Sequence, residues 1–74
     1  MSILPILGTR EVMRRLTRAG FLLVKIKGSH HIFLHPATGR TTSVPLHGGK
    51  TVGRNLLAKI IKQAGLTTDE FLDL

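Results

Sequence analysis

The chain has 74 residues, of which 42% are hydrophobic, and its 11 Lys and Arg against four Asp and Glu give a net charge of +7. This length predicts one domain, residues 1–74, with one core, and the hydrophobic fraction is sufficient to form it. With no cysteine, disulfides, thiolate metal sites and cysteine nucleophiles are excluded, and no apolar run approaches the ~20 residues of a membrane span, so we expect a cytoplasmic protein without a membrane partner.

The positive charge is concentrated before the C-terminal end of the chain. Three of the four acidic residues, Asp69, Glu70 and Asp73, lie in the last six positions. A strongly basic surface favours a polyanion, because neutralised phosphates release counterions, or an acidic protein surface. We therefore expect a polyanionic partner, with solubility alone as the plainer interpretation of the charge.

The first predicted helix begins near Thr9, whose hydroxyl is suited to cap it. Gly20 falls where a left-handed residue would end it. Its apolar residues recur at helical spacing and are Val12, Met13, Leu16 and Ala19.

Three strands are predicted next, over residues 21–27, 30–35 and 40–44. Gly28-Ser29 fits the two central residues of a tight hairpin turn, because glycine supplies the positive φ that the first position needs. Pro36 and Gly39 bound a second turn. We expect a three-stranded antiparallel meander.

The Gly28-Ser29 turn fixes a register for the first hairpin. The expected pairs are Lys27 with His30, Ile26 with His31, Lys25 with Ile32 and Val24 with Phe33. One face would then carry Leu22, Val24, Ile26 and Phe33, and we expect the helices to cover it, with His31 and His35 there or at its edges. His30 would share the open face with Lys25 and Lys27.

A second amphipathic helix is predicted over residues 52–64, ending at Gly65. Thr67 followed by Glu70 has the spacing of a capping box for a short last helix that carries Phe71. The element order is α-β-β-β-α, an α+β fold with both helices on one face of the sheet. It resembles the order of double-stranded-RNA-binding domains, which recognise RNA mainly by shape and phosphate contacts.

His30 is the candidate catalytic residue. Histidine can take and give a proton near neutral pH, and adjacent lysines would hold a phosphate and stabilise its added negative charge. Gly28 and Ser29 would present this histidine, and the expected RNA-binding residues are Lys25, Lys27, Arg40 and Lys50.

Plainer interpretations stand beside this one. An exposed histidine on a strand is commonly only a polar residue, and no metal or cofactor is expected, because His30 and His31 point to opposite faces. The segment Leu46-His47-Gly48-Gly49-Lys50 precedes a helix, so its backbone could contact a phosphate or could simply form a turn.

Several strings of the sequence resemble the HicA family. They are Gly20-Phe21, Lys27-Gly28-Ser29-His30-His31-Ile32-Phe33, His35-Pro36, Val44-Pro45-Leu46-His47 and the closing helix at residues 56–65. The resemblance covers nearly all of the chain from Thr9 onward, and residues 2–8 lie outside it.

The resemblance implies the toxin of a type II toxin-antitoxin system. Such a toxin is an mRNA interferase, an endoribonuclease with a double-stranded-RNA-binding-domain-like fold, and a HicB antitoxin keeps it inactive. By analogy His30 is the catalytic histidine, and Gly28 and Ser29 form the turn that presents it. The alternatives are a non-catalytic RNA-binding or regulatory module and a pure protein-interaction domain.

Overall fold

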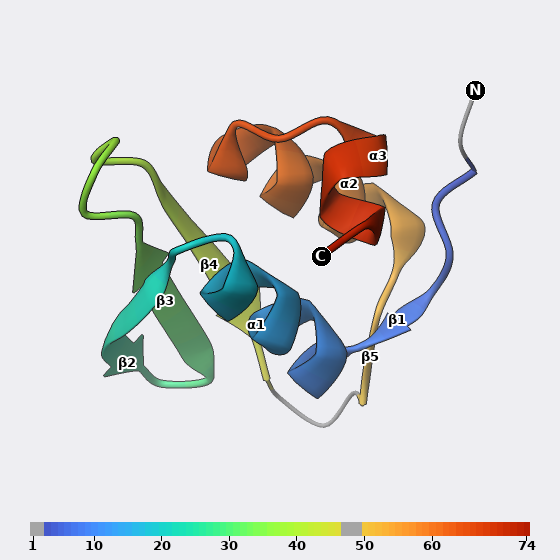
Figure 1. The fold of residues 1–74 in the computed structure, drawn as a ribbon. Coiled ribbons are helices and arrows are strands. Elements are labelled where there is room, and N and C mark those ends of the chain that lie inside the picture. The colour runs from blue at the N-terminus through green and yellow to red at the C-terminus, as the bar shows by residue number, and fades with distance from the viewer. Residues whose placement is uncertain (1–2, 47–49) are drawn as a thin grey trace.

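The computed structural model describes residues 3–46 and 50–74, and within them it confirms the α+β class and the expected α-β-β-β-α order. Two short strands at the N-terminal sides of the two longer helices were not expected, and they pair with each other antiparallel. In chain order the elements are β1 (Leu7–Gly8), α1 (Thr9–Arg18), β2 (Leu22–Lys27), β3 (His30–Leu34), β4 (Thr41–Pro45), β5 (Thr51–Val52), α2 (Arg54–Ala64) and α3 (Thr68–Leu72) (Figure 1).

The N-cap of helix α1 lies one residue before the predicted cap, Thr9. Gly8 is the N-cap, no side chain caps the helix, and Thr9 is its first residue, so the prediction that Thr9 caps it is wrong. The physical reason is the pairing of β1 with β5. Next to this pair, the Thr9 N–H donates to the Lys50 carbonyl at 2.9 Å, and Thr9 is only 2% exposed.

The predicted C-terminal end of α1 is confirmed. Gly20 has a φ of 103°, and its N–H donates to the Thr17 carbonyl at 3.0 Å. The next N–H, that of Phe21, donates to the Leu16 carbonyl at 3.0 Å. This pair of bonds is a Schellman motif, which turns the chain from the helix directly into β2.

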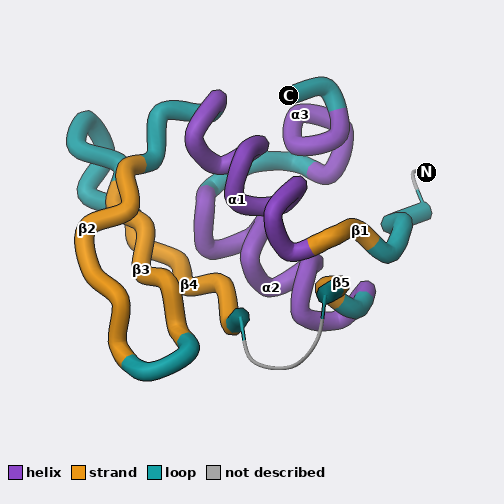
Figure 2. The backbone as a smooth tube through the Cα atoms, turned by 90° about the horizontal axis from the view of Figure 1, so that it is seen from below, coloured by secondary structure: helices purple, strands orange, loops and turns teal. Residues whose placement is uncertain are grey.

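The main sheet has the strand order β2-β3-β4, with β3 in the centre and every pairing antiparallel. Helices α1 and α2 lie on one side of this sheet and pack chiefly against β4, whereas β2 is the outermost strand (Figure 2). The other face of the sheet is open, as predicted.

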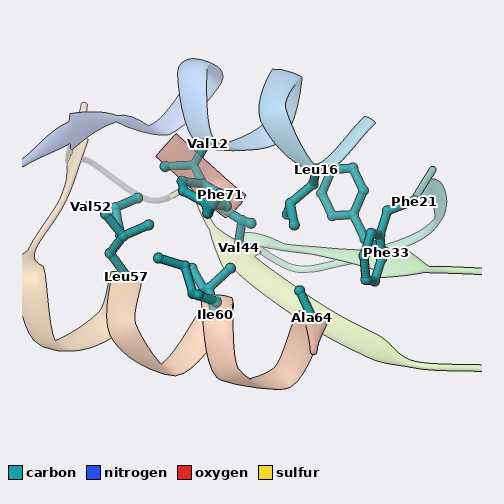
Figure 3. Packing of buried hydrophobic residues seen from close by; sticks show 11 residues of the cluster. Val12, Leu16, Phe21, Phe33, Val44, Val52, Leu57, Ile60, Ala64 and Phe71 are labelled. Carbon is teal, nitrogen blue, oxygen red and sulfur yellow. The ribbon is translucent and has the colours of Figure 1, made fainter. Parts of the chain in front are cut away.

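The buried hydrophobic residues form one cluster between the helices and the inner face of β3 and β4. In Figure 3, Leu16, Phe21 and Phe33 lie together at one end, and Val52 and Leu57 lie at the other. Phe71 of α3 is fully buried in the same cluster, so the short last helix closes the core.

Strand β2 departs from its prediction in register. The pairs Lys27–His30, Ile26–His31 and Lys25–Ile32 are confirmed, but Leu23, and not Val24, lies opposite Phe33. Val24 is the extra residue of a β-bulge, which shifts every residue before it by one position. Leu22 therefore pairs with Leu34 and moves to the open face.

The predicted burial of β2 is also wrong. Leu22, Val24 and Ile26 are 55%, 53% and 57% exposed, because α1 and α2 pack chiefly over β4 and leave most of this edge strand uncovered. Phe33, on the central strand, is the member of that predicted set that is buried, at 3% exposure.

The last two helices complete the fold. Helix α2 begins at Arg54 with Gly53 as its N-cap, so Val52 belongs to β5 and not to the helix. The capping box of α3 is confirmed, with the Thr67 N–H donating to Glu70 Oε1 at 2.8 Å and the Glu70 N–H donating to Thr67 Oγ1 at 3.1 Å. Within residues 3–46 and 50–74, the helices are all too short to cross a membrane.

Candidate functional site

His30 is the first residue of β3, and its side chain is exposed. As β3 is the central strand, His30 has a neighbour on both sides: Lys27 lies opposite on β2 and Pro45 lies opposite on β4. A residue held between two strands has a well-defined position. The imidazole is therefore presented to solvent from a fixed part of the sheet.

The turn before His30 explains how it is presented. Gly28 has a φ of 60°, and no non-glycine residue among those described, Ser29 included, has a positive φ. A positive φ at the first central position alone corresponds to a type II′ turn. The Ser29 carbonyl accepts a hydrogen bond from the Leu46 N–H at 2.6 Å. This bond attaches the end of β4 to the turn, so Gly28-Ser29 is fixed to both neighbouring strands.

Two lysines share the open face with His30. Lys27 is directly opposite, a position in which Cβ atoms are typically about 5 Å apart, and Lys25 is a diagonal neighbour at roughly 7–8 Å. Both side chains are exposed. Their ammonium groups can therefore approach a phosphate that also reaches the imidazole.

Two further residues of this face were not singled out from the sequence. Ile32 follows His30 on the same face of β3, and Ser43 of β4 lies opposite Ile32, which makes Ser43 a second diagonal neighbour of His30. The β3–β4 register that places Ser43 there depends on the second turn, where the His35 N–H donates to the Arg40 carbonyl at 2.9 Å. The spacing of Pro36 and Gly39 was the available signal.

Arg40 is not brought to this site. It precedes β4 at the end remote from Pro45, five residues along the strand, which at ~3.3 Å per residue is roughly 16 Å from the level of His30. A Cβ added to Gly65 would lie 2.5 Å from Arg40 Nε, so the guanidinium group packs over the C-terminal end of α2.

Lys50 is exposed and lies beside the start of α1. Its carbonyl accepts from the Thr9 N–H, and it borders a pocket of about 590 Å³ that Gly8, Arg10 and Leu46 also line. The predicted phosphate contacts of His47, Gly48 and Gly49 fall outside the described residues.

The other two described histidines, His31 and His35, pack against other parts of the fold. His31 is half-buried on the helix side of β3, opposite Val44, and its Nδ1 has no hydrogen-bond partner among the described residues. His35 Nε2 lies 3.2 Å from the Ala19 carbonyl oxygen. The His35 ring packs edge-to-face against the Phe21 ring, with 5.1 Å between the two ring centroids. The expectation that both histidines point inward or lie at the edges of that face is confirmed.

No three His, Cys, Asp or Glu side chains in the described part of the chain gather closely enough to hold a metal ion. The chemistry available at the candidate site is therefore that of one imidazole, two ammonium groups and the Ser43 hydroxyl on a solvent-exposed sheet face. These groups can bind an anion and transfer a proton.

A comparison with protein families finds a match over residues 9–66 to a family described as the HicA toxin of bacterial toxin-antitoxin pairs. The matched segment runs from the first residue of α1 to just beyond α2, so it includes the whole β2-β3-β4 sheet, while β1 and α3 lie outside it. A search among curated proteins gives no significant match.

Proposed function

Because the chain belongs to the HicA toxin family, and is therefore the toxin of a toxin-antitoxin system, we propose that it acts as an endoribonuclease that cleaves mRNA, with His30 as its catalytic residue. The observation that carries this proposal is the pairing of exposed His30 with Lys27 on the open face of the sheet. Gly28 and Ser29 serve the reaction by holding this pair in place.

The reaction needs a proton acceptor and a proton donor. When the 2′-OH loses its proton, its oxygen attacks the adjacent phosphorus, the bond to the 5′ oxygen breaks, and that oxygen takes up a proton. The products are a 2′,3′-cyclic phosphate and a free 5′-OH. His30 performs one of the two proton transfers, a role that typically contributes ~10²- to 10⁴-fold in rate.

The lysines bind the reacting phosphate. Lys25 and Lys27 are close enough to His30 to neutralise the charge that develops on the phosphate oxygens during the attack. We propose that Arg40, which is exposed but remote from His30, and Lys50, which is exposed beside the start of α1, contact other phosphates of a longer RNA.

The proposed partner that keeps the enzyme inactive is a HicB-type antitoxin, and the proposed compartment is the cytoplasm, where mRNA is available. A basic face around His30 attracts an acidic protein surface as it attracts RNA, since electrostatic complementarity accelerates association. An antitoxin that occupies this face would exclude RNA.

The test is cleavage of labelled RNA by the purified chain in the presence of a chelator. We expect the wild-type chain and Thr41→Ala to cleave, because Thr41 is an exposed residue of the same face at the remote end of β4, and His30→Ala to lose cleavage. Cleavage by His30→Ala at the wild-type rate would refute the catalytic role. RNA binding without cleavage by any of the three proteins would support the non-catalytic module instead.

A further inference from the structure

The edge strand β2 exposes apolar side chains on both of its faces. Leu22, Leu23, Val24 and Ile26 are 55%, 47%, 53% and 57% exposed, and they make up four of the six large hydrophobic residues that are exposed in the described part of the chain. Figure 2 shows β2 at the outer edge of the sheet, on the side away from α1 and α2. Several exposed apolar side chains gathered on one strand indicate an interaction surface.

The backbone of β2 is also available for pairing. Within residues 3–46 and 50–74, β3 is the one strand that pairs with it, so alternate N–H and C=O groups of β2 face outward without a partner strand. Such an edge accepts a further strand from another chain.

The lysines of β2 argue against a second copy of this chain as that strand. Antiparallel self-pairing about Lys25, Ile26 or Lys27 would in each case place a lysine opposite a lysine, and like charges directly opposite destabilise a sheet. The same two lysines would pair well with carboxylates. The charges of this half of the edge, beside His30, therefore select an acidic strand and disfavour self-pairing centred on Lys25, Ile26 or Lys27.

We propose that β2 is the docking edge for a strand of the antitoxin, which extends the sheet to four strands. That strand places acidic side chains on the open face opposite Lys25 and Lys27, and apolar side chains on the other face against Leu23 and Ile26. The identity of the partner as the antitoxin rests on the proposed function. Inhibition follows because the acidic side chains neutralise the two lysines beside His30.

The first test is hydrogen exchange on the complex of the full chain with a HicB-type antitoxin co-expressed with it. We expect the exchange of the outward-facing amides of β2 to be slower in the complex than in the free chain by roughly tenfold or more, because a paired edge is protected from solvent. Absence of a complex, or β2 amides that exchange equally fast in both states, would overturn the inference.

Charge reversal supplies the second test. The double variant Lys25→Glu and Lys27→Glu should weaken antitoxin binding by roughly tenfold or more, because it places glutamates opposite the acidic side chains of the antitoxin strand. Lys59→Glu with Lys62→Glu, on exposed residues of α2, makes the same charge change away from the edge and should have a much smaller effect. Equal losses in the two double variants would mean that net charge alone drives binding, and would overturn the inference.

An apolar variant separates this inference from the proposed function. Ile26→Thr should keep RNA cleavage and the melting temperature of the wild-type chain but escape inhibition by the antitoxin, since Ile26 is 57% exposed and lies on the face opposite to His30. A chain that never cleaves RNA, yet whose β2 amides the antitoxin protects, would refute the nuclease and retain the docking edge.

Two other occupants would overturn the inference. A free chain that sediments as a dimer with protected β2 amides would show that a second copy takes the edge. RNA that protects those outward amides while the antitoxin does not would assign the edge to nucleic acid.

Discussion

Lys27 and His30 are partners in the antiparallel ladder, separated along the chain by the two turn residues Gly28 and Ser29. Their side chains share the open face of the sheet because directly opposed residues point to the same side. A local sequence feature, the two-residue turn, thus brings an imidazole and an ammonium group together without help from the distant core.

The cleavage defects of lysine and arginine variants should depend on substrate length, because Lys27 lies beside His30 and Arg40 lies at the other end of the sheet. A dinucleotide has one phosphate and cannot reach both ends. Lys27→Gln should slow cleavage of a dinucleotide and flatten the salt dependence of binding by about one phosphate contact, whereas Arg40→Gln should leave dinucleotide cleavage unchanged. Cleavage rates measured on a dinucleotide and on a long RNA check this.

A slower dinucleotide reaction in Arg40→Gln would contradict the separation of the two sites. A rate for Lys27→Gln that equals the wild-type rate would instead remove Lys27 from the reaction.

The two adjacent histidines should differ in their effect on stability. His30→Ala is expected to change the free energy of unfolding by less than about 0.5 kcal/mol, because His30 is exposed. His31→Ala should destabilise by about 1 kcal/mol, because His31 is half-buried on the helix side opposite Val44. Thermal denaturation checks both, with a shift of about 4–8 °C expected per kcal/mol in a domain of this size.

Gly28→Ala should impair both stability and cleavage. A side chain at its φ of 60° is strained although no atom lies within 4 Å of the added Cβ, and we expect a loss of about 1–2 kcal/mol. Gly39→Ala is the matched control, with a φ of 75° and equally open surroundings, but in the turn remote from His30. It should lose similar stability and keep its cleavage rate under conditions where it stays folded; an equal loss of activity in both variants would argue against a positioning role for Gly28.

Thr67→Ala should destabilise the chain by about 1 kcal/mol by removing the hydroxyl that accepts from the Glu70 N–H. Helix α3 has five residues and carries the fully buried Phe71, so its N-cap supports the core. Urea denaturation measures the loss, and Thr67→Ser, which keeps an accepting hydroxyl, should recover most of it. Equal stability of Thr67→Ala and wild type would mean that burial of Phe71 alone holds α3.

The sequence by itself determined the features that depend on residues close together in the chain. The Gly28-Ser29 turn predicted the pairing of Lys27 with His30, and Thr67 with Glu70 predicted the capping box. Turn chemistry and helix capping involve residues within about four positions of each other, so their signals are readable locally. The open-face position of His30 followed from this turn.

Only the tertiary structure decided which apolar residues are buried. The alternation of β2 predicted an inner face with Val24 and Ile26, but burial depends on where the helices lie, and α1 and α2 pack chiefly over β4 and leave these two side chains exposed. The bulge at Val24 and the distance of Arg40 from His30 likewise depend on how consecutive strands pair, which turn and capping signals do not specify residue by residue. A strand's own pattern shows that it has an apolar face, but the rest of the chain determines whether that face is covered.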